Sequence, residues 1–263
     1  MSRVAAALRL SGFVLVTLLG LPFQQLFVVV SPAAARNFPH YYHRLVCRIL
    51  GIRLTVRGAP LRGQPCLLAA NHVSWLDIPV LSAAAPVSFV AKREVNGWAG
   101  FGLLARLQRT VFIDRDRRQT TGVKRDEMAE RLKAGDLLVL FAEGTSTDGL
   151  RVRPFKSAFF GAAEIPGVAV QPVTVAYVRH WGLAMTRRRR PNYAWYGDMD
   201  LPPHLWEALG SGPVSVEVTF HPPLPDGGRK AVAAAAEGVI RKSLREALHA
   251  RPAAAGGTAA HAH

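Results

Sequence analysis

The sequence predicts an α/β protein with a mostly parallel sheet and flanking helices, preceded by an N-terminal helical segment that associates with a membrane. Short apolar, β-rich runs alternate with helical stretches along most of the 263 residues, and this alternation is typical of parallel sheets. One long uncharged apolar run lies within the first 30 residues, as expected of a membrane segment. A chain of this length can bury a substantial core.

The apolar run covers residues 10–30 and carries no formal charge. A helix needs about 20 residues to cross the hydrocarbon core, so the run is just long enough to span a membrane. It also fits a segment that dips into one leaflet, with a bend at Pro22. A third interpretation is a cleavable signal peptide that ends at the alanines 33–35.

Positive charge after the run argues against export. The arginines that follow it are Arg36, Arg44, Arg48, Arg53 and Arg57. Dense positive charge in this place keeps the following chain on the cytoplasmic side. We therefore expect residues 1–35 to remain as an anchor, spanning or half-inserted, that holds the protein to the cytoplasmic face of the inner membrane.

The remaining elements follow from the hydrophobic pattern. Strands are expected at residues 52–56, 65–70, 87–91, 110–113, 137–141, 168–176 and 214–220. Helices are expected at residues 75–84, 98–108, 121–133 and 156–164, and at 230–249 after a linker rich in proline and glycine. Residues 36–250 would then form one domain. Residues 251–263 contain mainly alanine, glycine and histidine without periodicity and are expected to form a disordered tail.

Composition limits the classes of partner. The formal net charge is +15, which favours an anionic partner such as a nucleic acid, a membrane surface or an acidic substrate. The sequence argues against nucleic-acid binding, because the expected strands carry Leu, Val and Ala instead of interleaved aromatic and basic residues. The two cysteines, Cys47 and Cys66, form no CxxC pair, so we expect neither a disulfide framework nor a metal site.

The polar run from Asn71 to Asp77 is the first candidate site. It directly follows the expected strand 65–70, and open α/β sheets place their sites at such strand ends. The imidazole of His72 and the carboxylate of Asp77 could pair, leaving the other ring nitrogen free to take a proton from a hydroxyl. Alternatively, Asn71 or Ser74 caps the next helix and His72 only lies at the surface.

Three further groups suit an anion. The loop Glu143-Gly144-Thr145-Ser146 follows a strand and offers hydroxyls and backbone N–H groups. Arg115 ends another strand, and Lys156 begins a helix. Each alone could simply be a charged residue that leaves the core. Together with His72 and Asp77, they predict a site at the ends of successive strands.

These motifs resemble a known family. Asn71-His72-x4-Asp77 resembles the NHx4D motif of the glycerolipid acyltransferases typified by 1-acyl-sn-glycerol-3-phosphate acyltransferase. The blocks Phe112–Arg115, Phe141–Thr145 and Val170–Val173 resemble the family's other three motifs, in the same order. The resemblance implies a membrane-associated α/β enzyme that moves a fatty acyl chain from acyl carrier protein or coenzyme A to a lysolipid hydroxyl, with no further cofactor.

The resemblance also implies a role for each site residue. His72 would be the general base that deprotonates the acceptor hydroxyl, and Asp77 would orient the imidazole. The hydroxyl would attack the thioester directly, without an acyl-enzyme. The anionic head of the acceptor would be held by Arg115, Glu143, Gly144, Thr145, Ser146 and Lys156. The basic residues 187–190, followed by Trp195 and Tyr196, are expected either to rest on anionic headgroups or to form a solvated loop.

Departures from the family pattern concern the acceptor. Ala142 and Ser146 stand where the family often has proline and arginine, and Arg109 stands where a glycine usually opens the second block. The combined motifs resemble those of lyso-ornithine lipid acyltransferases. The sequence therefore predicts lysophosphatidate as the first acceptor, giving phosphatidate, and lyso-ornithine lipid as a close alternative. A membrane-tethered basic binding protein and a catalytically dead scaffold are remote alternatives.

Overall fold

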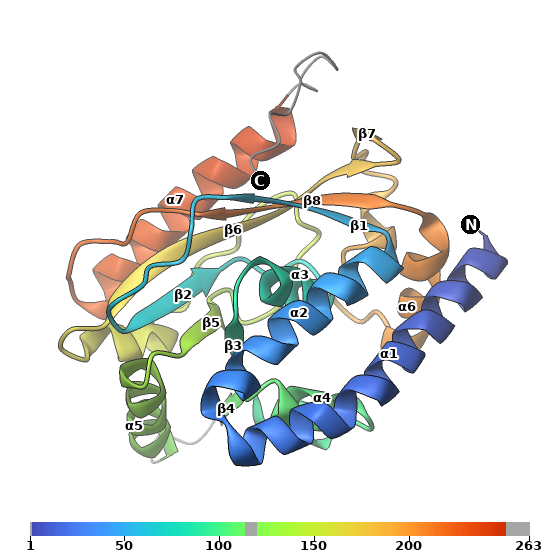
Figure 1. Ribbon diagram of the computed structural model, residues 1–263. Coiled ribbons are helices and arrows are strands. Elements are labelled where there is room, and N and C mark those ends of the chain that lie inside the picture. The colour runs from blue at the N-terminus through green and yellow to red at the C-terminus, as the bar shows by residue number, and fades with distance from the viewer. Residues whose placement is uncertain (1, 114–119, 251–263) are drawn as a thin grey trace, which may run out of the picture.

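The computed structural model describes residues 2–113 and 120–250 (Figure 1). Its strands form one sheet in the order β1-β8-β6-β2-β5-β3-β4, with the short β7 paired to β6. β6 runs antiparallel to β7 and β8, and the other pairs are parallel. This confirms the predicted α/β class. The strands are β1 (Ile52–Arg57), β2 (Cys66–Ala70), β3 (Val87–Lys92), β4 (Val111–Ile113), β5 (Leu137–Phe141), β6 (Ala169–His180), β7 (Leu183–Ala184) and β8 (Val214–Phe220).

Helices cover both faces of the sheet. They are α1 (Arg3–Val30), α2 (Pro32–Leu50), α3 (Asp77–Ala84), α4 (Phe101–Leu107), α5 (Thr120–Lys133), α6 (Leu201–Ser211) and α7 (Arg229–His249), with 3-10 helices η1 (Arg93–Gly97), η2 (Ser157–Glu164) and η3 (Arg190–Asn192). β2 is buried along its whole length, as expected of a central parallel strand. Leu68 packs in the core under α2 and α3, whereas Leu67 packs in the core under α5, η2 and α7.

The N-terminal helices α1 and α2 lie side by side as an antiparallel hairpin (Figure 1). Ser31 separates them, and its side chain accepts a hydrogen bond from the N–H of Ala34. α1 continues unbroken past Pro22, and it is long and apolar enough to cross a membrane. The residue-35 boundary predicted for the anchor falls inside α2, which contributes Val46 and Leu50 to the core.

Both ends of α1 are tied to the body of the protein. Arg9 donates a hydrogen bond to the carbonyl of Leu209 in α6 (2.7 Å). The buried amide of Gln24 donates to the carbonyls of Ala35 (3.0 Å) and Leu107 (2.7 Å). The large apolar side chains on the outward side of α1, from Val4 to Val30, are 43–82% exposed. The hairpin is therefore docked on the domain while it presents an apolar surface outward.

Three elements differ from the sequence-based expectation. The segment 157–164 consists of 3-10 turns interrupted by a kink at Phe160, whose backbone angles are non-helical. α2 and α6 are helices that the pattern did not predict. α6 begins at Leu201, directly after Asp200, and two prolines follow in its first turn. Proline is favoured in the first turn of a helix, so a signal for α6 was present. The expected tail, residues 251–263, lies outside the described residues.

Candidate active site

The candidate site lies where β2 and β5 end, at one edge of the sheet. His72 Nδ1 is 2.8 Å from the Asp77 carboxylate, so the pair predicted from spacing forms. Asp77 is fully buried and also accepts hydrogen bonds from the N–H groups of Val73 (2.6 Å) and Ser74 (3.0 Å) and from the hydroxyl of Tyr177 (2.8 Å). Because Asp77 accepts the Nδ1 proton, the lone pair of the neutral imidazole is on Nε2.

His72 is held on three sides. Its ring stacks on Phe141, with centroids 3.9 Å apart. Its carbonyl accepts hydrogen bonds from the N–H (3.0 Å) and the hydroxyl (3.2 Å) of Thr147. Its N–H donates to Glu143 (2.8 Å). The side chain still reaches the surface, with 19% of its area exposed. The imidazole is thus fixed in orientation and accessible to a reactant.

Glu143 lies beneath the site, and both oxygens of its carboxylate accept hydrogen bonds. One oxygen accepts the N–H of His72, and the other accepts the N–H of Arg153 (2.7 Å). Burial raises the pKa of Glu143 from its ordinary 4.5 to about 7, although these two hydrogen bonds favour the charged form and act in the opposite direction. The geometry makes Glu143 a positioning residue for the His72 main chain.

The other predicted headgroup residues have varied surroundings. Gly144 has φ of +75°, and its N–H closes the turn onto the carbonyl of Phe141. Thr145 is exposed and Ser146 is half-buried. Lys156 is exposed, and its ammonium lies 5.8 Å above the ring of Phe159. Arg115 lies outside the described residues.

Asn71 and Ser74 do not cap the following helix. The Asn71 side chain makes two hydrogen bonds with the backbone of Val175, one to its carbonyl and one from its N–H. Asn71 therefore joins the end of β2 to β6. The Ser74 hydroxyl is fully buried and has no hydrogen-bond partner among the described residues. Asp77 itself accepts the N–H groups that precede α3, which explains why this helix begins at Asp77 and not at Trp75.

The basic segment 187–190 differs in part from its expected role. Residues 187–189 are exposed, but Arg190 is buried and donates a hydrogen bond to the carbonyl of Gly149 (3.3 Å). Trp195 donates its backbone N–H to Val73 (3.0 Å) and its indole N–H to Met199 (2.7 Å). Arg190 and Trp195 therefore support the catalytic loops, and only the three exposed arginines are free to meet headgroups.

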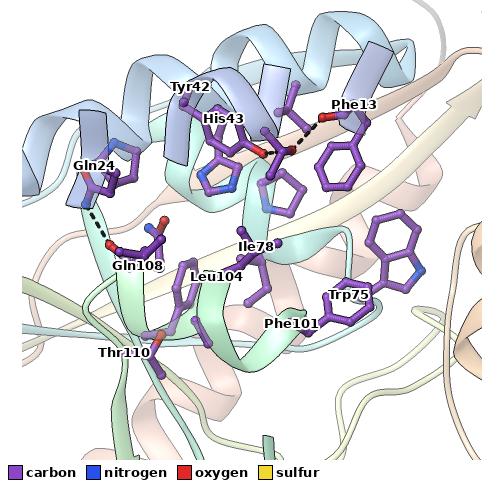
Figure 2. Close-up of a pocket in the computed structure, with 18 of the residues that line it drawn as sticks. Phe13, Gln24, Tyr42, His43, Trp75, Ile78, Phe101, Leu104, Gln108 and Thr110 are labelled. Atoms are coloured by element: carbon purple, nitrogen blue, oxygen red, sulfur yellow. Dashed lines mark hydrogen bonds between the residues drawn. The ribbon is translucent and has the colours of Figure 1, made fainter. Parts of the chain in front are cut away.

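An apolar cavity of about 240 Å³ lies between the N-terminal hairpin and α3, α4, α6 and β3 (Figure 2). Phe13, Trp75, Ile78, Phe101 and Leu104 are among its lining residues. Phe89 also lines it and stacks on Phe141 (6.0 Å between centroids), which in turn stacks on His72. Two stacked rings, those of Phe89 and Phe141, therefore separate the cavity from the His72 imidazole.

Comparison with known proteins identifies the family. The model of the family described as Acyltransferase matches residues 53–176. A lyso-ornithine lipid O-acyltransferase from Brucella abortus is 47% identical over 241 residues, which cover 88% of this chain and 90% of that protein. The chain belongs to this acyltransferase family.

Other relatives support the same conclusion. A lyso-ornithine lipid O-acyltransferase from Rhizobium meliloti is 42% identical over 90% of this acyltransferase and 85% of that protein. A 1-acyl-sn-glycerol-3-phosphate acyltransferase from Neisseria meningitidis is 35% identical over 78% of this chain and 75% of its own. The crystal structure of the 1-acyl-sn-glycerophosphate acyltransferase from Thermotoga maritima has the same fold, with a TM-score of 0.70 and 22% identity over 96% of this chain and all of that one.

The acyltransferase is thus an O-acyltransferase of lysolipids. The sequence predicted the pair His72 and Asp77 because the two residues are only five positions apart in the chain. It missed Tyr177, Phe141 and the cavity, whose residues come from segments far apart in the chain.

Proposed function

We propose that this acyltransferase acylates lyso-ornithine lipid, with lysophosphatidate as the second candidate acceptor. The observation that carries the proposal is the pair of lyso-ornithine lipid acyltransferases that match nearly the whole chain at 47% and 42% identity, against 35% for the lysophosphatidate enzyme. This reverses the order expected from the motifs alone. Ser146 agrees with it, because a hydroxyl offers a phosphate one neutral donor where an arginine offers a charged fork.

His72 acts as the general base in the proposed mechanism. Nε2 accepts the proton of the acceptor hydroxyl while that oxygen attacks the thioester carbonyl, and Asp77 stabilises the imidazolium. The tetrahedral intermediate then collapses to the ester. The departing thiolate takes the proton back from Nε2, which regenerates neutral His72 and releases a thiol.

The acyl chain passes directly from thioester to acceptor. Neither Ser74 nor Cys66 is suited to carry the acyl group as an acyl-enzyme. Ser74 is fully buried, and burial raises the pKa of the Cys66 thiol to about 12. Acyl carrier protein and coenzyme A both remain candidate donors. We place the donor's acyl chain in the apolar cavity, because Phe89 of its lining stacks on Phe141, which stacks on His72.

The N-terminal hairpin is the proposed membrane contact. α1 is held to the body near both ends by Arg9 and Gln24, which favours a helix half-inserted along the membrane surface over one that spans it. The exposed apolar side chains of α1 would enter the leaflet. The arginines that follow α1 favour the cytoplasmic face of the inner membrane.

The acceptor is tested by measuring kcat/KM for lyso-ornithine lipid and lysophosphatidate with the wild type and with Ser146→Arg. The wild type should prefer lyso-ornithine lipid. If position 146 faces the head group, the substitution should shift the ratio toward lysophosphatidate by about 1.5–3 kcal/mol, the value of a charged hydrogen bond. Thr145→Arg, at the exposed neighbouring position, is the matched control. A wild type that acylates only lysophosphatidate would overturn the proposed acceptor, and an unchanged ratio would remove the argument from Ser146.

A further inference from the structure

A second cavity, of about 390 Å³, lies at the opposite edge of the sheet from His72. Its polar lining consists of Arg36, Asn37, Arg62, Gln64, Lys133 and Asp136. These residues precede β2 and β5 or belong to α2 and α5. Because β2 and β5 run from this cavity toward His72 and Glu143, about 15 Å of strand separates the two sites. The cavity shares no residue with the candidate active site.

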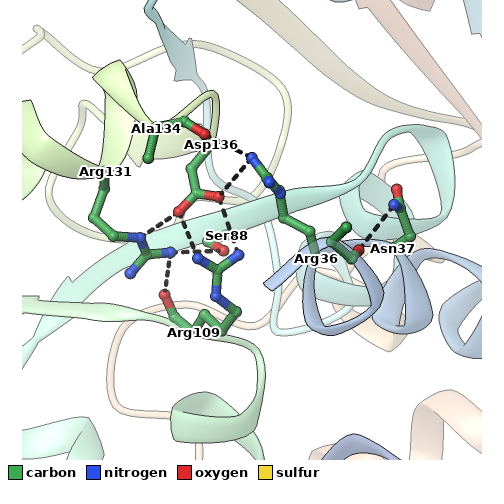
Figure 3. A network of polar contacts seen from close by, with 8 residues as sticks. Arg36, Asn37, Ser88, Arg109, Arg131, Ala134 and Asp136 are labelled. Carbon is green, nitrogen blue, oxygen red and sulfur yellow. Dashed lines mark hydrogen bonds and ion pairs between the residues drawn. The ribbon is translucent and has the colours of Figure 1, made fainter. Parts of the chain in front are cut away.

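One residue of the cavity wall, Asp136, is surrounded by three arginines, of which Arg36 also lines the cavity (Figure 3). Arg109 binds the Asp136 carboxylate with two nitrogens (3.0 and 2.8 Å), Arg131 donates to it through Nε, and Arg36 lies 3.6 Å from it. The carboxylate is 1% exposed, and the three guanidiniums are 20–29% exposed. One negative charge therefore faces three positive ones. Burial lowers the pKa of Arg109, and the nearby Arg131 and Arg36 act in the same direction, while Asp136 opposes them.

Two more cations extend this excess. Arg62 and Lys133 line the same cavity and are exposed. Within residues 2–113 and 120–250, neither Arg62 nor Lys133 makes an ion pair or a side-chain hydrogen bond. Gly135 keeps the wall open beside them: its φ is +82°, and a Cβ there would lie 3.3 Å from Nη1 of Arg36. The cavity thus offers cationic donors that no carboxylate within residues 2–113 and 120–250 pairs with.

We propose that this cavity binds a phosphate group, as an anion site separate from the acceptor site. Guanidinium groups bind phosphate oxygens in pairs, and a lysine adds a mobile point charge. The phosphate could belong to the headgroup of an anionic phospholipid or to a soluble phosphate compound. The hairpin turn supports the lipid source, since Val29 and Val30 are 82% and 61% exposed only a few residues before Arg36. That source depends on the membrane contact proposed above.

An anion in this place would also fasten the N-terminal hairpin. Arg36 belongs to α2 and donates a hydrogen bond to the carbonyl of Ala134 (2.8 Å), between α5 and β5. A phosphate that bridges Arg36 to Lys133 or Arg62 would add a second link between the hairpin and the body. Binding should therefore raise the unfolding temperature of the protein.

The test uses the full-length purified protein without acyl donor or acceptor. In one arm, pyrophosphate binding is measured by calorimetry and by the shift in unfolding temperature. In the other, flotation with phosphatidylcholine vesicles is compared with flotation with vesicles that contain phosphatidylglycerol. The variant is Arg62→Gln combined with Lys133→Gln. The control is Lys242→Gln combined with Arg245→Gln, which removes the same charge from exposed positions on α7.

The cavity variant should bind at least tenfold more weakly, and the control should change less than twofold. If only the cavity variant loses pyrophosphate binding, the site takes a soluble phosphate. If only the cavity variant loses binding to the phosphatidylglycerol vesicles, the site takes a lipid headgroup. Equal losses in both variants, or no binding in either arm, would overturn the proposal. Since no substrate is present, the result does not depend on which lysolipid the enzyme acylates.

Discussion

The two edges of the sheet each bury one aspartate, and the donors around the two carboxylates differ. Asp77 accepts hydrogen bonds from backbone N–H groups, a tyrosine hydroxyl and one imidazole. Asp136 is bound by three arginines. An imidazole exchanges protons near neutral pH, whereas a guanidinium keeps its charge throughout the accessible range. The first edge is therefore equipped for proton transfer, and the second for electrostatic attachment and anion binding.

The largest effect should come from Asp77→Asn. The amide can present its N–H₂ to His72, which would leave the imidazole in the wrong tautomer with its lone pair on Nδ1. We expect acyl transfer to fall by about 10²–10⁴-fold, the range lost when general-base catalysis fails. The measurement is kcat of purified protein whose unfolding curve shows a folded state. A variant that keeps more than about a third of wild-type kcat would show that Asp77 does not set the tautomer.

Asp136→Asn should act on stability and not on the chemical step. Removing the carboxylate leaves three guanidiniums facing one another, and an uncompensated buried charge costs about 3–5 kcal/mol. We expect the lower end of this range because the guanidiniums are partly exposed. Urea unfolding measures the change, with Asp226→Asn in the exposed linker as the control. If the free energy of unfolding falls by less than about 1 kcal/mol, Asp136 does not hold the α5–β5 turn to α2.

Glu143→Gln tests the buried carboxylate of the His72 edge through the pH dependence of the free energy of unfolding. The pKa of Glu143 is raised from 4.5 to about 7 in the folded protein, so the native state binds this proton more tightly than the unfolded chain. The free energy of unfolding should therefore fall as the pH rises from about 4.5 to 7, by up to about 3 kcal/mol. Glu143→Gln should lose this decline, while Asp226→Asn should retain it. Parallel pH profiles for the wild type and Glu143→Gln would contradict the assigned burial.

The sequence identified contacts between residues that are close in the chain and missed contacts between segments that are far apart in it. His72 and Asp77 lie five residues apart, so their spacing allowed the pairing, and the resemblance to the family motif favoured it over a surface histidine. Tyr177 reaches Asp77 across 100 residues of chain, and no periodic pattern reports such a contact. The seven main strands were found because each is a short apolar run. The docked hairpin was not foreseen, because residues 10–30 have the same composition whether they span a membrane or pack along α2.

Glu143 shows a second limit of the sequence. Its motif suggested a headgroup ligand, and only the three-dimensional contacts show both of its oxygens bound to main-chain N–H groups. Arg109 shows the opposite case. It replaces a family glycine and retains a positive φ of 59°. Its guanidinium supplies the two bonds to Asp136 that offset this strain. The sequence linked this departure to the acceptor, whereas the structure places Arg109 in the arginine cluster around Asp136.

The central claim is that His72 is the general base, and His72→Ala tests it most directly. Acyl transfer is measured with purified wild type and variant at matched protein and lipid concentrations, and unfolding curves and vesicle binding confirm an intact protein. We expect the variant to lose about 10²–10⁴-fold in kcat while its stability and vesicle binding stay close to those of the wild type. A folded, membrane-bound variant that keeps more than about a tenth of the wild-type rate would contradict the assignment.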